Sequence, residues 1–133
     1  MMTSLILNGQ LDISPLISAR NFLSKAVKEA ESYLEIAGAI QAFEVTYELS
    51  WKTLKKVLAF KGIEVTSAYD AFRLGAKEGL INDPKVWFDY LRKRNITVHE
   101  YEDSIMEKVY PILPSFLQDV NSLISELEKL NEI

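Results

Sequence analysis

Apolar residues recur along most of the chain at intervals of three and four, the spacing that places side chains on one face of an α-helix. No segment alternates between apolar and polar residues for long enough to predict a strand. The pattern therefore predicts an all-α domain. The aromatic residues of its clearest stripe are expected to lie in the core rather than to stack on the bases of a nucleic acid. That stripe comprises Ile40, Phe43, Tyr47, Trp51, Leu54 and Leu58.

Residues that begin and end helices divide this pattern into segments. Ser14 is expected to be the N-cap of a first helix, with Pro15 at its first position. The apolar spacing carries this helix as far as Gly38. The second helix holds the stripe described above, and Gly62 is placed to end it because glycine readily adopts the left-handed conformation.

Two more helix starts follow. Ser67 with Asp70 three residues later resembles a capping box and predicts a short third helix that Gly79 ends. Asp83 followed by Pro84 repeats the N-cap and first-turn signature, which predicts the start of a fourth helix. The apolar residues of this fourth helix are Val86, Trp87, Tyr90 and Leu91.

A last helix is expected to begin near Asp103 or Ser104. Pro111 and Pro114 each remove a backbone donor, but the apolar period continues across them, which predicts one kinked helix rather than two. Residues 1–133 are thus predicted to form a single domain, an antiparallel bundle of four main helices plus one short helix.

The composition is close to the average for one soluble domain, with 133 residues, 48% of them apolar and 26% charged. Cysteine is absent, which excludes thiol catalysis, and any multi-histidine site or serine–histidine triad would depend on the single histidine, His99. The apolar run Leu5 to Leu7 is too short for a signal peptide, and no stretch is long enough to span a bilayer. We therefore expect a cytoplasmic protein that does not enter a membrane.

The charge is distributed unevenly along the chain. The net charge is −4, yet residues 49–99 carry ten basic and five acidic side chains between two acidic flanks. This distribution favours either a basic patch that meets phosphates or a solvated helix face balanced by the acidic C-terminal segment. The basic residues that stand together are Lys52, Lys55, Lys56 and Lys61, and then Arg92, Lys93 and Arg94.

One short segment gathers a guanidinium, an amide, an imidazole and a phenol, on Arg94, Asn95, His99 and Tyr101. Imidazole both takes and gives a proton near neutral pH. A guanidinium holds a phosphate or stabilises charge that develops on it. Together these groups suit cleavage of RNA, in which a ribose 2′-hydroxyl attacks the neighbouring phosphate without metal or cofactor.

Helix geometry limits how Arg94 and His99 act together. They are five residues apart, which on an ideal helix turns their side chains about 140° from each other. They converge only if the helix is irregular near Ile96 to Val98, if it ends there, or if they meet across a two-fold dimer. Tyr101, in contrast, continues the stripe that contains Arg94. The alternative is that arginine and histidine are an ordinary surface pair.

The segment from Arg94 to Tyr101 reads R-x4-H-x-Y and resembles the signature of the HEPN (higher eukaryotes and prokaryotes nucleotide-binding) superfamily. The resemblance extends from Leu11 to Leu127 through the ordered segments IQAFEVTYELSWKTLK, KGIE, AYDAFRLGAKEGLI and RKRNITVHEY. These segments are similar to those of the small HEPN proteins known as nucleotidyltransferase substrate-binding subunits, the HepT-type toxins.

The resemblance implies a HEPN-like homodimer that acts as a metal-independent endoribonuclease on RNA. It also implies a toxin whose antitoxin is a separate minimal nucleotidyltransferase chain. By position, Arg94 and His99 match the catalytic pair, and Asn95 matches the polar residue beside the arginine. Tyr101 matches the tyrosine to which the partner adds AMP. Further candidates for contact with RNA phosphates are the neighbouring Arg92 and Lys93.

Two other functions stay open at this point. One is a non-catalytic subunit that presents nucleotide or substrate to the nucleotidyltransferase, and the other is a helical interaction protein without a site. Glu100, Asp103 and Glu107 share a helix face open to magnesium, but acidic residues at a helix start are more often solvated, so no metal site is expected. Glu44 and Glu48 lie one helical turn apart, and their carboxylates either contact a partner protein or are exposed to solvent.

Overall fold

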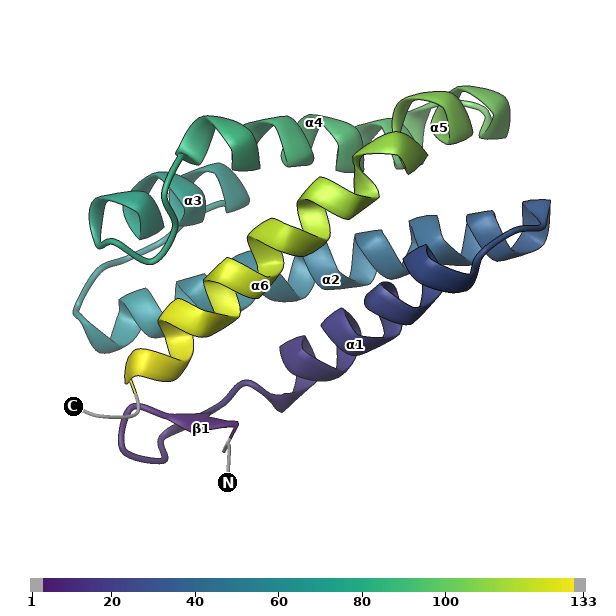
Figure 1. Cartoon of the computed structure of the whole chain (residues 1–133). Coiled ribbons are helices and arrows are strands. Elements are labelled where there is room, and N and C mark those ends of the chain that lie inside the picture. The colour runs from purple at the N-terminus through teal and green to yellow at the C-terminus, as the bar shows by residue number, and fades with distance from the viewer. Residues whose placement is uncertain (1–3, 131–133) are drawn as a thin grey trace.

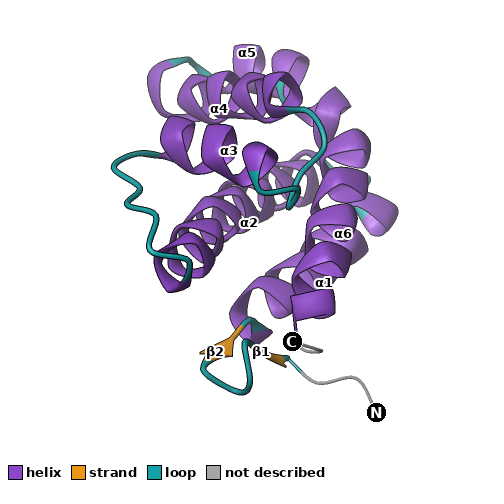
Figure 2. Cartoon of the chain, turned by 90° about the vertical axis from the view of Figure 1, so that its left-hand side faces the viewer, coloured by secondary structure: helices purple, strands orange, loops and turns teal. Residues whose placement is uncertain are grey.

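The computed structural model of the chain describes residues 4–130 and is an all-α bundle, which confirms the predicted fold class (Figure 1). The short helix α3 packs against α2 and α4 at one end of the bundle (Figure 2). The helices are α1 (Ser14–Glu29), α2 (Tyr33–Phe60), α3 (Ala68–Lys77), α4 (Pro84–His99), α5 (Glu102–Lys108) and α6 (Leu113–Lys129).

The caps of α3 and α4 are formed by the predicted residues. The Ser67 hydroxyl accepts a hydrogen bond from the backbone N–H of Asp70 at 3.1 Å. The Asp70 carboxylate in turn accepts from the backbone N–H of Thr66 at 3.3 Å, one residue earlier than a standard capping box requires. At α4, the Asp83 carboxylate accepts from the backbone N–H of Lys85 at 2.9 Å. Local capping therefore fixes where both helices begin.

The first helix ends at Glu29, so the predicted extension to Gly38 is wrong. The reason is a capping box that the apolar spacing concealed. The Ser32 hydroxyl accepts from the backbone N–H of Glu35 at 3.1 Å, and the Glu35 carboxylate accepts from the backbone N–H of Ser32 at 2.9 Å. These two bonds start α2 at Tyr33 and place Gly38 inside it.

The last part of the chain forms two helices, so the prediction of one kinked helix is wrong. The helix α5 ends at Lys108, a 3₁₀ turn covers Tyr110–Ile112, and α6 starts at Leu113. Pro111 lies in the turn and Pro114 in the first turn of α6, where a missing backbone donor costs no helical hydrogen bond. The two prolines therefore separate helices that share one apolar period.

Aromatic rings join four helices in the core. Phe43 of α2 and Phe116 of α6 pack edge to face with their centroids 4.7 Å apart. Phe72 of α3 stacks on Trp87 of α4 at 4.9 Å. Phe43 and Tyr47 are almost fully buried, which confirms that the first part of the aromatic stripe is core. This cluster fixes α4, the helix that carries the candidate chemistry, against α2 and α6.

A two-stranded antiparallel sheet precedes the bundle and was not predicted. Its strands β1 (Leu5–Ile6) and β2 (Leu11–Asp12) are too short for their alternation to be recognised in the sequence. Ile6 is fully buried and secures this hairpin against the bundle. None of the helices within residues 4–130 is long and apolar enough to cross a membrane.

Candidate functional site

The candidate residues lie on the second half of α4, and two buried aromatic residues hold that helix in place. Trp87 and Tyr90 are each 3% exposed. The ring of Tyr90 packs 4.9 Å from Phe116, and its hydroxyl donates to the Asp119 carboxylate on α6. Burial, together with the bond to Asp119, raises the pKa of Tyr90, so the phenol remains a neutral donor. The position of α4 relative to α6 is therefore fixed.

Arg94 is directed from α4 toward two carboxylates on α2. Its Nη1 lies 3.7 Å from Glu44 Oε2, and its Nε lies 3.5 Å from Glu48 Oε1. The two glutamates are one turn apart on α2, so both face the same guanidinium. The Arg94 side chain is 23% exposed, which leaves part of it open to solvent.

The contacts of Arg94 are long, and its hydrogen-bonding capacity is only partly used. Its Nη1 lies 3.4 Å from the Thr97 hydroxyl, and its Nε is buried without a hydrogen-bond partner. Hydrogen bonds from N–H to oxygen usually span about 2.7–3.2 Å. The Nη2 of Arg94 makes no hydrogen bond within residues 4–130 and is not buried, so Arg94 retains N–H donors for a bound anion such as phosphate.

Arg94 borders a groove of about 450 Å³, which we call the Arg94 groove. Glu44, Glu48 and Lys52 place two negative charges and one positive charge beside the guanidinium. The groove is therefore nearly neutral as a whole, and an anion that enters competes with the carboxylates for Arg94. The lining residues are Gln41, Glu44, Val45, Glu48, Leu49, Lys52 and Arg94.

His99 and Arg94 are not brought together within one chain. The helix α4 is regular from Ile96 to Val98 and ends at His99, so neither an irregular turn nor an early helix end bends the two side chains together. His99 is exposed and does not line the Arg94 groove, and its imidazole makes no hydrogen bond or ion pair within residues 4–130. Asn95 is also exposed. The remaining route to convergence is a second copy of the chain.

Tyr101 does not continue the face of Arg94, contrary to the prediction. Val98 is 59% exposed and Tyr101 is 91% exposed, so the buried stripe of α4 stops at Arg94. The backbone of Glu100 is extended, and Tyr101 is the N-cap residue of the next helix, α5. A shared face would require one continuous helix, whereas the chain leaves the helical conformation after His99. Tyr101 therefore presents its ring to solvent.

The acidic residues considered for magnesium do not form a cluster. No group of three or more metal-ligating side chains is found within the part of the chain that the structure describes. The Glu100 carboxylate instead accepts from the Ser104 hydroxyl and from Lys108 Nζ. These two bonds hold the pKa of Glu100 below its usual value.

The basic residues before Arg94 lie outside the Arg94 groove. Arg92 pairs with Asp89 at 3.1 Å on the exposed side of α4. Lys93 makes no ion pair with any residue in the described range 4–130. Their role in binding phosphate stays a prediction.

Sequence reasoning missed the partners of Arg94. Glu44 and Glu48 were noted as a pair one turn apart, but their spacing alone does not say which helix they face. The usable signal is that they flank the buried Phe43 and Tyr47 on α2, so their face borders the core where α4 packs.

Comparison with known proteins identifies the family. Residues 11–129 match the family described as nucleotidyltransferase substrate binding protein like. The chain belongs to this family. It is also 36% identical over 121 residues to the probable ribonuclease HepT of Haemophilus influenzae, a match that covers 87% of this chain and 82% of that protein.

Two solved structures resemble this member of the nucleotidyltransferase substrate-binding family. One is a protein of Thermus thermophilus, with a TM-score of 0.78 and 28% identity over 84% of this chain and 98% of the other. The other is a Haemophilus influenzae protein whose structure is described as revealing the fold of a substrate-binding domain of a nucleotidyltransferase. It has a TM-score of 0.76 and 30% identity over 87% of this chain and 98% of the other. The helical bundle is thus the fold of the family.

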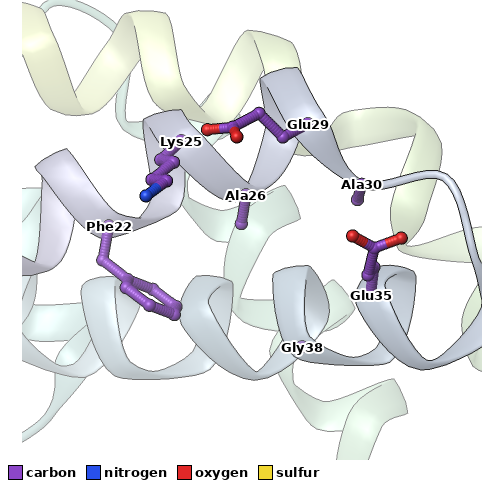
Figure 3. Close-up of a pocket in the computed structure, with 7 residues that line it drawn as sticks. All are labelled: Phe22, Lys25, Ala26, Glu29, Ala30, Glu35 and Gly38. Carbon is purple, nitrogen blue, oxygen red and sulfur yellow. The ribbon is translucent and has the colours of Figure 1, made fainter.

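This family member also has an exposed apolar surface between α1 and α2. Figure 3 shows Phe22 reaching from α1 over α2, beside a concavity of about 280 Å³ that includes Gly38. Phe22 is 63% exposed and Leu34 is 81% exposed. A neighbouring concavity shares Phe22 and Gly38 with this one and Val45 with the Arg94 groove. The apolar surface therefore continues directly into the Arg94 groove.

Proposed function

We propose that this chain is a metal-independent endoribonuclease of the HEPN class and the toxin of a cytoplasmic toxin–antitoxin pair. The observation that carries the proposal is Arg94, a half-buried guanidinium with unused donors that borders an open groove. Such a group suits a phosphate, because its donors match the phosphate oxygens. The 36% identical relative named as a probable ribonuclease HepT supports the same activity.

The reaction is attack of a ribose 2′-hydroxyl on the neighbouring phosphate. Arg94 binds the phosphate and stabilises the negative charge that develops on its oxygens, while Asn95 offers an amide to the same substrate. One imidazole takes the proton of the 2′-hydroxyl as its oxygen bonds to phosphorus, and a second gives a proton to the departing 5′-oxygen. The products are a 2′,3′-cyclic phosphate and a 5′-hydroxyl, so the reaction uses no metal and no cofactor.

This chemistry requires a homodimer, because each chain has one histidine. In a two-fold dimer the two copies of His99 enter one cleft with Arg94, and one acts as base while the other acts as acid. The apolar surface around Phe22, together with the exposed Leu34 near the start of α2, suits contact with a second copy, since exposed apolar patches mark interfaces. The dimer also explains why one chain alone separates His99 from Arg94.

The antitoxin in this proposal is a minimal nucleotidyltransferase that adds AMP to Tyr101. The Tyr101 phenol is 91% exposed and makes no hydrogen bond within residues 4–130, so it is accessible to another protein. Its oxygen attacks the α-phosphorus of ATP, an O–P bond forms, pyrophosphate leaves and the phenol proton passes to solvent. The attached nucleotide adds bulk and negative charge two residues from His99, which excludes RNA.

The test is cleavage of a defined single-stranded RNA by the purified chain in excess EDTA. We expect cleavage by the wild-type chain and a rate lower by about a hundredfold or more in Arg94→Ala and in His99→Ala. Asn95→Ala is expected to lose less. Lys77→Ala, an exposed change on α3, is the matched control and should keep full activity. A folded His99→Ala protein with wild-type activity would overturn the proposal.

A second function has two observations in its favour. A relative of known structure is described as a substrate-binding domain of a nucleotidyltransferase, and here His99 and Arg94 do not meet within one chain. In that case the chain presents a nucleotide or another substrate to its partner and cleaves nothing. It would bind the nucleotidyltransferase while showing no RNA cleavage as wild type, and Arg94→Ala would reduce substrate transfer by the partner.

A further inference from the structure

A groove rich in lysine adjoins the Arg94 groove on α2. Leu49 and Lys52 line both the Arg94 groove and a neighbouring concavity of about 440 Å³, so the two form one continuous surface. We call the second part the lysine groove. Its polar and aromatic lining comprises Asp12, Trp51, Lys52, Thr53, Lys55 and Lys56.

The lysines of this region differ in how their charge is compensated. Lys61 pairs with Glu78 at 3.6 Å, and Lys52 lies 3.8 Å from Glu48. Lys55 and Lys56 are exposed and make no ion pair within the described range 4–130. Two neighbouring positive charges are thus uncompensated at one end of the continuous surface.

The acidic residue in the lysine groove is already engaged. The Asp12 carboxylate accepts hydrogen bonds from the backbone N–H of Ser14 at 2.9 Å and from the Ser14 hydroxyl at 3.0 Å. These bonds lower the pKa of Asp12, the bond from the backbone N–H most of all, and they orient the carboxylate toward the start of α1. Asp12 therefore does not pair with Lys55 or Lys56.

We infer that the lysine groove binds the phosphodiester backbone of single-stranded RNA beside the phosphate that Arg94 holds. Lys55 and Lys56 lie seven and eight residues beyond Glu48, about 10–12 Å along the helix axis, a span that a few nucleotides of single-stranded RNA cover. Trp51 lines the same groove and is half-buried, so it adds an aromatic surface for a base. This inference rests on the proposed function and extends it to how RNA is held.

The test measures RNA affinity without cleavage. A fluorescein-labelled single-stranded RNA is titrated with the His99→Ala chain at several salt concentrations, and anisotropy reports binding. The double variant Lys55→Gln/Lys56→Gln, made in the same background, is expected to bind about three- to tenfold more weakly. The slope of log K against log salt should become shallower by about 0.7 for each lysine.

The control has the same charge change at two exposed lysines elsewhere. Lys77→Gln/Lys85→Gln removes charge from α3 and α4, outside both grooves, and should keep both affinity and slope. If the Lys55/Lys56 double variant binds like the control, or if both double variants lose affinity equally, the lysine groove does not bind RNA.

A kinetic measurement separates this inference from the proposed function. With His99 intact, Lys55→Gln/Lys56→Gln should raise the KM for a long RNA about three- to tenfold and leave its kcat unchanged. Cleavage of a dinucleotide, which reaches only the Arg94 groove, should be unchanged. If the Lys55→Gln/Lys56→Gln variant has the wild-type KM for the long RNA, the lysine groove does not bind RNA, but the proposed nuclease activity is unaffected. If the wild-type protein cleaves no RNA and the lysine variants nevertheless bind RNA more weakly, the proposed nuclease activity is wrong and RNA binding by the lysine groove is supported.

Discussion

Arg94 and His99 lie on one regular helix, and their side chains point in different directions. Arg94 faces Glu44 and Glu48 across the Arg94 groove, whereas His99 ends α4 in solvent. Five residues of regular helix separate side chains by about 140°, so packing within one chain does not bring them together. In the proposed nuclease, a cleft that uses both residues therefore requires a second copy of the chain.

The first prediction concerns dimer formation. Phe22→Asp combined with Leu34→Asp places carboxylates at the exposed apolar position of the α1–α2 surface and at an exposed leucine near the start of α2. Because burying unpaired charges is costly, dimer affinity should fall by about a hundredfold or more. Sedimentation and light scattering at micromolar concentration measure the change, and RNA cleavage should fall with the dimer fraction.

The control is Val86→Asp, which introduces one carboxylate at an exposed apolar position on α4 outside that surface and is compared with each single variant, Phe22→Asp and Leu34→Asp. It should remain dimeric and active. A wild-type chain that is strictly monomeric and still cleaves RNA would refute the composite cleft.

The second prediction concerns modification of Tyr101. Co-expression with the nucleotidyltransferase should yield one AMP on Tyr101, mapped by mass spectrometry of peptides, and Tyr101→Phe should escape modification. Tyr69→Phe is the control. Tyr69 is half-exposed but its ring stacks on Phe88 at 4.2 Å, so this variant should still receive AMP on Tyr101. AMP found on Tyr90 or Tyr110 instead would contradict the assignment.

The third prediction concerns the start of α2. Ser32→Ala removes the capping box and should lower the free energy of unfolding by about 1 kcal/mol, measured by urea denaturation. Ser18→Ala, an exposed change within α1, should have no destabilising effect because alanine favours helix. Equal stability of the Ser32→Ala and wild-type chains would show that the cap does not hold α2 in place.

The fourth prediction concerns acid stability. The Arg73 side chain, with Thr66 second, holds the pKa of Asp70 below its ordinary value of 3.8. A carboxylate with a depressed folded-state pKa stabilises the fold above the unfolded pKa, and this stabilisation is lost as pH falls through the folded pKa. Asp70→Asn should therefore be less stable than wild type at pH 7, with the difference shrinking below about pH 3.8. A difference that is independent of pH in urea denaturation would contradict this.

Much of the fold was predictable because helix signals are local. Ser67, Asp83 and Pro84 start helices by bonds or backbone restraints within a few residues, and the structure confirms both starts. The errors arose where two local signals competed. Apolar spacing ran across the Ser32 capping box and across Pro111, and in each case the backbone signal decided where the helix ended.

The site was predictable only in part, because its geometry depends on contacts between helices. The residue types from Arg94 to Tyr101 are local, but the carboxylates that face Arg94 come from α2. The position of Tyr101 depends on the chain leaving the helix after His99, which no periodicity shows.

Attack by the 2′-hydroxyl is tested with an RNA that carries a single 2′-deoxy nucleotide at the cleaved position. The purified wild-type chain in EDTA is incubated with this RNA and with its all-ribose counterpart, and the end groups of the products are determined. We expect a 2′,3′-cyclic phosphate and a 5′-hydroxyl from the all-ribose RNA and no cleavage at the deoxy position. Equal cleavage of both RNAs, or products with a 5′-phosphate, would contradict it.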